Sequence, residues 1–401
     1  MNLADENFAG DSVTRRIDPL VERMAGFGTT IFAEMSALAV ATGAINLGQG
    51  FPDTDGPAEI MESAIAAIRA GHNQYPPGPG IPELRRAIAE HQARRYSLEL
   101  DPDTDVLVTA GATEAIAAAL CALAGPGDEV ICFEPYYDSY AASIALGGAG
   151  RRVVTLEAPG FRFDPDRLRA AVTAATRVVL LNSPHNPTGR VFDLEELTCI
   201  AELCVERDLL VISDEVYEHL VFDGRRHVPI ATLPGMAERT LTISSAGKSF
   251  SFTGWKIGWV TGPAALVTAV RTVKQFLTYV SGGPFQYAVV TALEMGDRVT
   301  DELAAALQSK RDRMTAGLRA AGFDVAPTEG TYFVCADIRP VGGIDGLEFC
   351  RTLPERAGVV AVPTQVFYDH VELGRQWIRF AFCKQDHVID EAVQRLARLA
   401  S

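Results

Sequence analysis

The sequence predicts an α/β protein in which a large domain with a mostly parallel β-sheet is joined to a smaller α+β domain. From residue 104 onward, apolar runs rich in β-branched residues alternate with helical patterns. Strands that are apolar on both faces are typical of a parallel sheet covered by helices. After Pro284 the pattern changes to long amphipathic helices followed by short apolar runs. The chain has 401 residues, 48% of them hydrophobic, which is enough for one large core and a smaller unit.

The expected elements follow one another in a regular order. Each expected strand is a short, mostly apolar run, and each expected helix has apolar residues at helical spacing. In the large domain we expect strands over residues 105–110, 128–134, 151–157, 176–182, 209–215 and 239–245, and helices over 113–124 and 194–208. In the smaller domain we expect helices over about 288–318, strands over 330–338, 358–364 and 377–383, and a terminal helix from residue 386.

Charge and composition exclude several classes of protein. The formal net charge is −15, from 36 basic and 51 acidic residues, and there is no run of Lys or Arg, so we expect no nucleic-acid partner. The longest apolar run, residues 115–124, is too short to span a bilayer, so we expect no membrane partner. Seven cysteines occur without a C-x-x-C pair or an H-E-x-x-H motif, which predicts neither disulfides nor a metal site. The expected location is the reducing cytoplasm.

A lysine just after an expected strand raises the question of a nucleotide site. Lys248 lies in the stretch ISSAGKSFSFTGWKIGW, residues 243–259. A P-loop has the pattern G-x-x-x-x-G-K-[ST], and this chain has Thr242 where the first glycine belongs. No G-x-G-x-x-G motif follows a strand either. The sequence therefore does not support nucleotide binding, and Lys248 taken alone reads as a solvated lysine.

Two polar side chains are expected at the same edge of the sheet as Lys248. Asp214 ends the aliphatic run LLVISD, with Tyr217 three positions later, and Asn186 lies in the turn SPHNPTG after another strand. The carboxyl ends of parallel strands are where α/β sheets bind ligands, and a buried carboxylate is costly unless a cation meets it. The alternatives are a helix cap for Asp214 and a simple turn for Asn186.

The same edge has the groups that bind a phosphate. Gly111, Ala112 and Thr113 begin a helix, where free backbone N–H groups form an anion site. Ser245 and Lys256 lie on either side of Lys248 and add a hydroxyl and a cation, although both also suit ordinary surface chemistry. Together with Asp214 for a cationic ring nitrogen and Lys248 for a Schiff base, these groups predict pyridoxal phosphate as the cofactor.

On these residues the chain resembles the fold-type I, class I and II aminotransferases that depend on pyridoxal phosphate. Matching segments run in the family's order from NLGQGFPD (46–53) to WIRFAFC (377–383), with NPTG, SDEVY and S-x-G-K-x-F between them. The resemblance implies a large domain with a mostly parallel seven-stranded sheet sandwiched by helices. It also implies three ranges: an N-terminal arm with part of the small domain at 1–45, the large domain at 46–287 and the small domain at 288–401.

The resemblance assigns the cofactor-binding residues. It implies that Lys248 forms the Schiff base and moves the proton at the substrate's Cα, and that Asp214 keeps the ring nitrogen protonated. It implies that Tyr217 and Asn186 hydrogen-bond the ring oxygen, and that Tyr137 stacks on the ring. At the position of Lys256 many relatives carry arginine, which forms a fork that lysine cannot form.

The resemblance also assigns substrate-binding residues and an assembly. Arg379 matches the arginine that binds the substrate's α-carboxylate, with Asn186 and the backbone at Gly50 beside it. Tyr75, in NQYPPGPG, matches a tyrosine that reaches the phosphate of the neighbouring subunit, which implies a homodimer with shared active sites. We find no additional arginine of the kind that binds the side chain of aspartate.

The segments also resemble one branch of the family, that of the kynurenine and glutamine transaminases, and within it the N-succinyldiaminopimelate aminotransferases. This implies ping-pong exchange between an L-amino acid and a 2-oxo acid, with glutamate and 2-oxoglutarate as the expected pair. Only small side chains occur at Ser281, Gly282 and Gly283, which predicts a roomy pocket for N-succinyl-L,L-2,6-diaminopimelate. The alternatives are a broad-specificity kynurenine, glutamine or methionine aminotransferase and a cysteine-conjugate C–S β-lyase.

Overall fold

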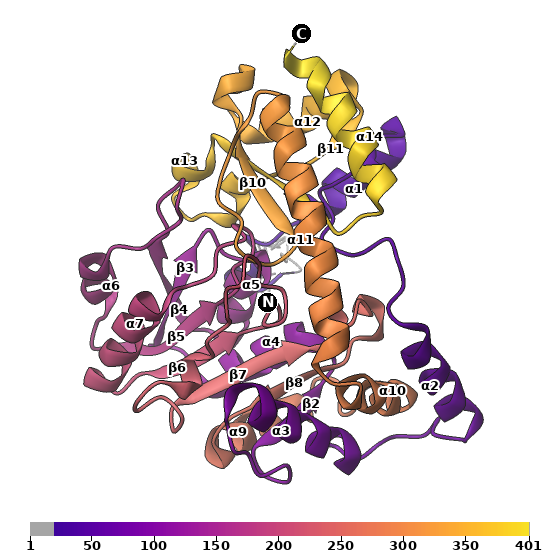
Figure 1. Ribbon diagram of the computed structural model, residues 1–401. Coiled ribbons are helices and arrows are strands. Elements are labelled where there is room, and N and C mark those ends of the chain that lie inside the picture. The colour runs from indigo at the N-terminus through magenta and orange to yellow at the C-terminus, as the bar shows by residue number, and fades with distance from the viewer. Residues whose placement is uncertain (1–19, 401) are drawn as a thin grey trace, which may run out of the picture.

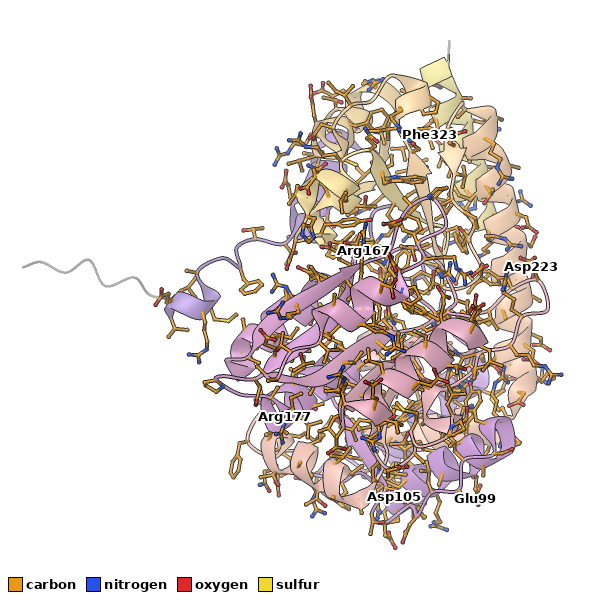
Figure 2. The ribbon with its side chains drawn as sticks, turned by 90° about the vertical axis from the view of Figure 1, so that its left-hand side faces the viewer. Glu99, Asp105, Arg167, Arg177, Asp223 and Phe323 are labelled. Carbon is orange, nitrogen blue, oxygen red and sulfur yellow. The ribbon has the colours of Figure 1, made fainter. Side chains whose placement is uncertain are left out.

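The computed structural model describes residues 20–400, which form a large unit around a sheet and a smaller unit packed against it (Figure 1). The first nineteen residues of the expected N-terminal arm lie outside the described residues. The short helix η1 (Glu22–Met24) contacts α5 (Asp138–Gly147) of the large unit. Figure 2 shows the described residues from the side, with their side chains. Within residues 20–400 no helix is long and apolar enough to cross a membrane.

The large unit contains the expected seven-stranded, mostly parallel sheet. Its strands lie in the order β2-β8-β7-β6-β5-β3-β4, and only β8 is antiparallel to its neighbours. The bounds are β2 (Val106–Thr109), β3 (Glu129–Glu134), β4 (Gly150–Thr155), β5 (Thr176–Asn182), β6 (Leu210–Asp214), β7 (Thr240–Ser245) and β8 (Gly258–Thr261). The strand β8 is absent from the runs that the sequence predicted, because its four residues, GWVT, follow a turn-rich motif without an aliphatic run of their own.

Helices cover both faces of this sheet, as predicted. On β5, Val178 and Leu180 belong to the core under one face, and Val179 and Leu181 belong to the core under the other, as the alternation of a strand requires. The first face is covered by α4 (Gly111–Leu123), α5 and α9 (Ala264–Lys274), and the second by α6 (Pro165–Ala171) and α7 (Leu194–Glu206). A capping box between Asp193 and Glu196 starts α7.

The smaller unit is an α+β layer above the large sheet. Its four-stranded sheet has the order β12-β13-β10-β9, and a two-stranded pair joins β1 to β11. The strands are β1 (Ile45–Asn46), β9 (Asp324–Val325), β10 (Phe333–Asp337), β11 (Val359–Val360), β12 (Val362–Pro363) and β13 (Trp377–Ala381). The helices around it are α1 (Ile31–Thr42), α11 (Asp297–Ala320), α12 (Gly346–Ala357) and α14 (Asp386–Leu396).

The expected helical stretch around residues 288–318 consists of two helices. The first, α10 (Gly283–Glu294), packs on α2 (Ala58–Arg69) and α3 (Pro82–Tyr96) of the large unit. Gly296, with φ of 73°, lies between it and α11, which rises into the smaller unit (Figure 1). The expected domain boundary at residue 287 falls inside α10, and the division into domains stays a prediction.

Candidate active site

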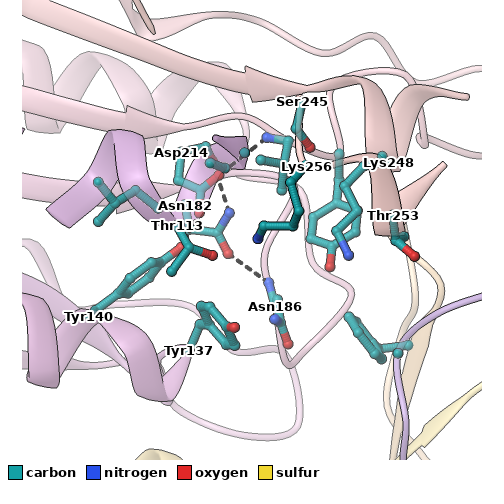
Figure 3. Close-up of a pocket in the computed structure, with 18 of the residues that line it drawn as sticks. Thr113, Tyr137, Tyr140, Asn182, Asn186, Asp214, Ser245, Lys248, Thr253 and Lys256 are labelled. Atoms are coloured by element: carbon teal, nitrogen blue, oxygen red, sulfur yellow. Dashed lines mark hydrogen bonds between the residues drawn. The ribbon is translucent and has the colours of Figure 1, made fainter. Parts of the chain in front are cut away.

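Three strands of the large sheet end at one edge, and a cavity of about 370 Å³ lies there (Figure 3). Asp214 is the last residue of β6, Ser245 is the last of β7, and α4 begins two residues after β2. This edge is where open α/β sheets bind ligands. The residues that line the cavity are Phe32, Gln49, Gly50, Gly111, Ala112, Thr113, Ile116, Tyr137, Tyr140, Asn182, Asn186, Asp214, Val216, Tyr217, Ser245, Gly247, Lys248, Thr253, Lys256, Ile257, Phe333 and Arg379.

Lys248 extends into the cavity from the short helix α8 (Ala246–Ser249), which follows β7 directly. Its amine donates a hydrogen bond of 2.7 Å to the phenolic oxygen of Tyr332 and lies 5.7 Å from the ring centre of Tyr217. Burial lowers the pKa of the lysine to about 8, although the charge of Asp214 opposes the shift. The neutral fraction of the amine near physiological pH is therefore far larger than that of an ordinary lysine, and the neutral form is the one that acts as a nucleophile or a base.

Asp214 is held in the wall of the cavity by neutral groups. One carboxylate oxygen accepts a hydrogen bond from the hydroxyl of Tyr140, and the other accepts one from the backbone N–H of Val216 at 3.3 Å. Burial raises the pKa of the carboxyl to about 6, while these hydrogen bonds and the charge of Lys248 act against the rise. A buried carboxylate with neutral partners is suited to pair with a cation that a ligand brings.

Two asparagines tie the strand ends together beside Asp214. The amide of Asn182, the last residue of β5, donates to the backbone carbonyl of Asp214 at 2.8 Å, and its oxygen accepts from the backbone N–H of Asn186 at 2.8 Å (Figure 3). The side-chain oxygen of Asn186 in turn accepts from Arg379 at 2.8 Å. The amide nitrogen of Asn186 is thereby left to donate to a ligand.

Arg379 reaches the same cavity from β13 of the smaller unit. It is 1% exposed, and its guanidinium lies 4.0 Å from the ring centre of Phe333. It donates to Asn186 and, at 3.0 Å, to the carbonyl of Gly48, while its Nε has no partner. Burial lowers the pKa of this group. A buried guanidinium with no carboxylate beside it among the described residues is suited to bind the carboxylate of a ligand.

The start of α4 forms an anion cradle with Lys256. Its N-cap residue Ala110 makes no side-chain capping bond, so the first backbone N–H groups are free for a ligand. Lys256 has a left-handed backbone with φ of 56°, and its Cε and Nζ each lie 3.2 Å from the point where a Cβ of Gly111 would stand. A Cβ on Gly258 would lie 2.7 Å from the carbonyl carbon of Gly111 and 2.8 Å from the nitrogen of Ala112. Two glycines therefore allow β8 and the helix start to approach.

Tyr137 and Tyr136 have different surroundings. Tyr137 lines the cavity, and its ring meets that of Tyr140 edge-on at 5.7 Å. Burial raises the pKa of Tyr137 to about 12. The hydroxyl of Tyr136 donates to Asp369 instead, and Tyr136 is not part of the lining. Tyr137 is thus the residue of the pair whose ring is available to a ligand.

The structure brings nearly all the predicted site residues into this one cavity. Tyr75 is the exception: it is 80% exposed, and its ring lies 5.5 Å from that of Tyr279. It lines a separate surface hollow together with Ser281, Gly282 and Gly283, so those small residues do not enlarge the cavity of their own chain.

Sequence reasoning missed three residues that position the site: Tyr140, Asn182 and Tyr332. Tyr140 lies one helical turn after Tyr137, and Asn182 ends a strand just as Asp214 does, so both had a local signal. Tyr332 had none, because an aromatic residue before a strand of the smaller unit reads as core.

The comparisons with known proteins agree with this geometry. The family model for aminotransferase class I and II matches residues 42–396, and the chain belongs to this family. It is 53% identical over 390 residues to the probable N-succinyldiaminopimelate aminotransferase of Mycobacterium tuberculosis, covering 95% of this chain and 98% of the relative. The solved structure of the N-succinyldiaminopimelate aminotransferase from that organism superposes with a TM-score of 0.93 at 54% identity, covering 95% of this chain and all of that one. A methionine aminotransferase of Escherichia coli is 40% identical, covering 95% and 99%.

The protein is therefore an aminotransferase, and members of this family use pyridoxal phosphate. The residues of the cavity fit that cofactor. The uncapped start of α4 with Lys256 suits its phosphate, the buried Asp214 suits its ring nitrogen, and the buried amine of Lys248 suits its aldehyde.

Proposed function

We propose that this aminotransferase moves the amino group of N-succinyl-L,L-2,6-diaminopimelate to 2-oxoglutarate. The observation that carries the proposal is the 53% identity to the Mycobacterium tuberculosis relative over 95% of the chain, together with a site of the same family. Under this proposal the donor's α-carboxylate binds Arg379, with Asn186 and the backbone at Gly50 beside it. Asn186 fixes the guanidinium through its side-chain oxygen, so the arginine is oriented before the substrate arrives.

The proposed roles of the other residues follow from the same geometry. When bound, pyridoxal phosphate supplies an electron sink that stabilises negative charge on the donor's Cα. Its phosphate would be held by Gly111, Ala112, Thr113, Ser245 and Lys256. Tyr137 would pack against its ring, and Tyr217 and Asn186 would hydrogen-bond its ring oxygen. Asp214, kept in place by Tyr140 and Asn182, pairs with the ring nitrogen. Lys248 would hold the cofactor through its amine, and the same amine would take the proton from the donor's Cα.

A second candidate is a broad-specificity enzyme that acts on methionine or kynurenine. One observation favours it: the cations that line the cavity within residues 20–400 are Lys248, Lys256 and Arg379, and each has a role already. The carboxylates at the far end of the succinylated substrate then lack a cation of their own among the described lining residues. The relatives include the methionine aminotransferase and a kynurenine–oxoglutarate transaminase of Dictyostelium discoideum that is 36% identical.

A half-reaction with single donors separates the candidates. The holoenzyme is mixed with one donor at a time and no 2-oxo acid, and the cofactor absorbance is followed. Conversion by glutamate and by N-succinyl-L,L-2,6-diaminopimelate supports the first candidate. Conversion by methionine, kynurenine or glutamine, with none by the succinylated donor, supports the second. Release of pyruvate from cysteine conjugates without a 2-oxo acid identifies the C–S β-lyase instead. Lys248→Ala is the negative control, in which no donor should convert the cofactor.

We also propose a homodimer in which each subunit completes the other's site. Tyr75 is 80% exposed beside Tyr279 at 56%, and Phe276 and Leu277 on the same segment are 82% and 54% exposed. Apolar side chains gathered in this way are typical of an interface. Tyr75 then serves the neighbouring cofactor, and the small residues 281–283 beside it shape the neighbouring pocket. Light scattering gives the mass, and Tyr75→Phe is expected to weaken cofactor binding without dissociating the dimer.

The proposed location is the cytoplasm. All seven cysteines are unpaired, which suits a reducing compartment.

A further inference from the structure

Tyr332, from the smaller unit, contacts Lys248, which belongs to the large unit. It precedes β10 in the smaller unit, follows Thr331, whose φ is 66°, and is 2% exposed. Its ring is held edge-on by Tyr217 at 5.3 Å and by Phe333 at 4.8 Å between ring centres. It is not part of the cavity lining, so its side chain faces Lys248 rather than the space for the substrate.

The hydrogen bonds of Tyr332 have a fixed direction. Its hydroxyl lies 2.7 Å from the backbone carbonyl of Gly50, and the hydroxyl of Tyr217 is a further neighbour. The carbonyl has no proton of its own, whereas Tyr217 and Lys248 both have protons to donate, so the phenolic proton belongs to the bond with Gly50. The phenolic oxygen is 2.7 Å from the amine of Lys248, and having given its proton to Gly50 it can only accept. The amine therefore donates an N–H to Tyr332 whether it is charged or neutral.

The approach of Gly50 depends on its lack of a side chain. A Cβ there would lie 2.5 Å and 2.6 Å from two ring atoms of Phe333 and 3.3 Å from the ring of Tyr332. The carbonyl that fixes the phenolic proton can thus come this close only from a glycine. Within residues 20–400 the amine of Lys248 makes no other hydrogen bond, so this bond alone sets its direction.

We propose that Tyr332 is a positioning residue for proton transfer: by accepting one N–H of Lys248 it keeps the nitrogen's lone pair on the side that faces the cavity. The inference rests on the proposed role of Lys248 in moving the proton at Cα. A neutral amine has one lone pair and two N–H bonds, and without a fixed acceptor it rotates among orientations of which only some face the substrate. Tyr332 removes the unproductive ones without touching the substrate.

The test is Tyr332→Phe in the holoenzyme, with Tyr368→Phe as the matched control. Tyr368 is also a tyrosine of the smaller unit, is 5% exposed and lies outside the cavity lining. We expect Tyr332→Phe to retain the cofactor and the unfolding midpoint but to slow single turnover of a donor about 10- to 100-fold, part of the usual gain from general base catalysis. The deuterium effect of a donor labelled at Cα should rise, and the donor KM should stay within about threefold.

A second readout does not depend on turnover. In the protein stripped of cofactor, carbamylation of Lys248 by cyanate is followed against pH by mass spectrometry of its peptide. An oxygen that accepts from an ammonium stabilises the charged form, so its loss should move the reaction to lower pH in Tyr332→Phe and leave it unchanged in Tyr368→Phe.

The outcomes separate this inference from the proposed function. A wild-type single-turnover rate and isotope effect with an unmoved carbamylation profile in Tyr332→Phe would overturn the positioning role, even if Lys248→Ala is inactive. Activity in Lys248→Ala would overturn the assignment of Lys248 itself. If Tyr332→Phe loses its fold, 3-fluorotyrosine at position 332 keeps the ring and weakens the oxygen as an acceptor, and the same directions are expected. An unchanged profile there would equally overturn the positioning role.

Discussion

The short helix α8, which contains Lys248, lies between two polar regions that differ in how their polar groups are paired. On one side is the cavity at the sheet edge, lined by Lys248, Lys256 and Arg379. On the other is a buried histidine cluster made of His91, Glu218 and His219. One ring nitrogen of each histidine and one carboxylate oxygen of Glu218 all lie within 4.8 Å of one another. His219 bonds the side chain of Ser249, the residue next to Lys248, at 2.9 Å. One short helix thus touches both regions.

The two regions differ in where their polar groups find partners. Among the ion pairs between residues 20 and 400, none includes a cation of the cavity. In the cluster, His219 uses its second ring nitrogen on His91 at 2.9 Å, and Glu218 accepts a hydrogen bond from Ser244. Because a buried charge without a partner is costly, it persists where a ligand supplies the partner. Arg379, which is buried, and Lys248, whose amine lies inside the cavity, have no acidic partner among the described residues and mark the binding side, whereas mutually bonded groups mark the structural side.

The largest expected effect is on the binding side. Lys248→Ala removes the proposed attachment point and base, so turnover should fall by at least about 10²- to 10⁴-fold, the usual contribution of a positioned acid or base. Because this amine has no ionic partner within residues 20–400, the urea midpoint should not fall. Lys310→Ala, on α11, is the control. A clear loss of stability in Lys248→Ala would break the contrast between the two sides.

The next effect separates binding from stability in a single residue. Arg379→Met should cost about 2 to 5 kcal/mol in kcat/KM of the donor, the range for removing one partner of a buried charge pair. The unfolding free energy of the protein without substrate should stay close to that of the wild type. The variant removes a desolvated charge that has no acidic partner among the described residues. Steady-state kinetics and urea unfolding of the same sample test both halves. Unchanged donor kinetics would place the carboxylate elsewhere.

On the structural side the order of effects should reverse. His219→Ala breaks the bonds to His91 and Ser249 and leaves a gap, so we expect a loss of about 2 to 3 kcal/mol in unfolding free energy. Turnover should fall less than tenfold, because losing the bond to Ser249 makes the position of the neighbouring Lys248 less well defined. If activity fell as far as in Lys248→Ala while stability held, the cluster would belong to the binding side.

The smallest effect is a dependence on pH. Burial lowers the pKa of His219 to about 3 and lowers that of His91 as well. Below about pH 6.5 these histidines bind protons in the unfolded chain but stay neutral in the folded one, so the unfolding free energy decreases as pH falls from about 6.5 toward 3. Between pH 7 and pH 5 His219 should account for about 2 kcal/mol of unfolding free energy. Urea melts at both pH values measure this, and His219→Gln should flatten the difference.

The sequence predicted those site residues whose position follows from a local motif, such as the end of a strand or the start of a helix. Asp214 follows an aliphatic strand, Asn186 lies in a Pro/Asn/Gly turn and Gly111 starts a helix, so their place at one sheet edge follows from strand direction. The histidine cluster could not be predicted, because His91 and His219 lie 128 residues apart and meet only through packing. The place of residues 281–283 was also out of reach, since it depends on how α10 packs against the large unit.

The contact between β8 and the start of α4 limits how this protein can change. A side chain at position 258 has no room beside the backbone of residues 111 and 112, so even a methyl group there would push the start of α4 away from β8. A saturation library at this position, selected for growth on the enzyme's activity, should return glycine alone. We therefore expect changes of substrate to arise at other residues of the cavity wall, with glycine kept at position 258.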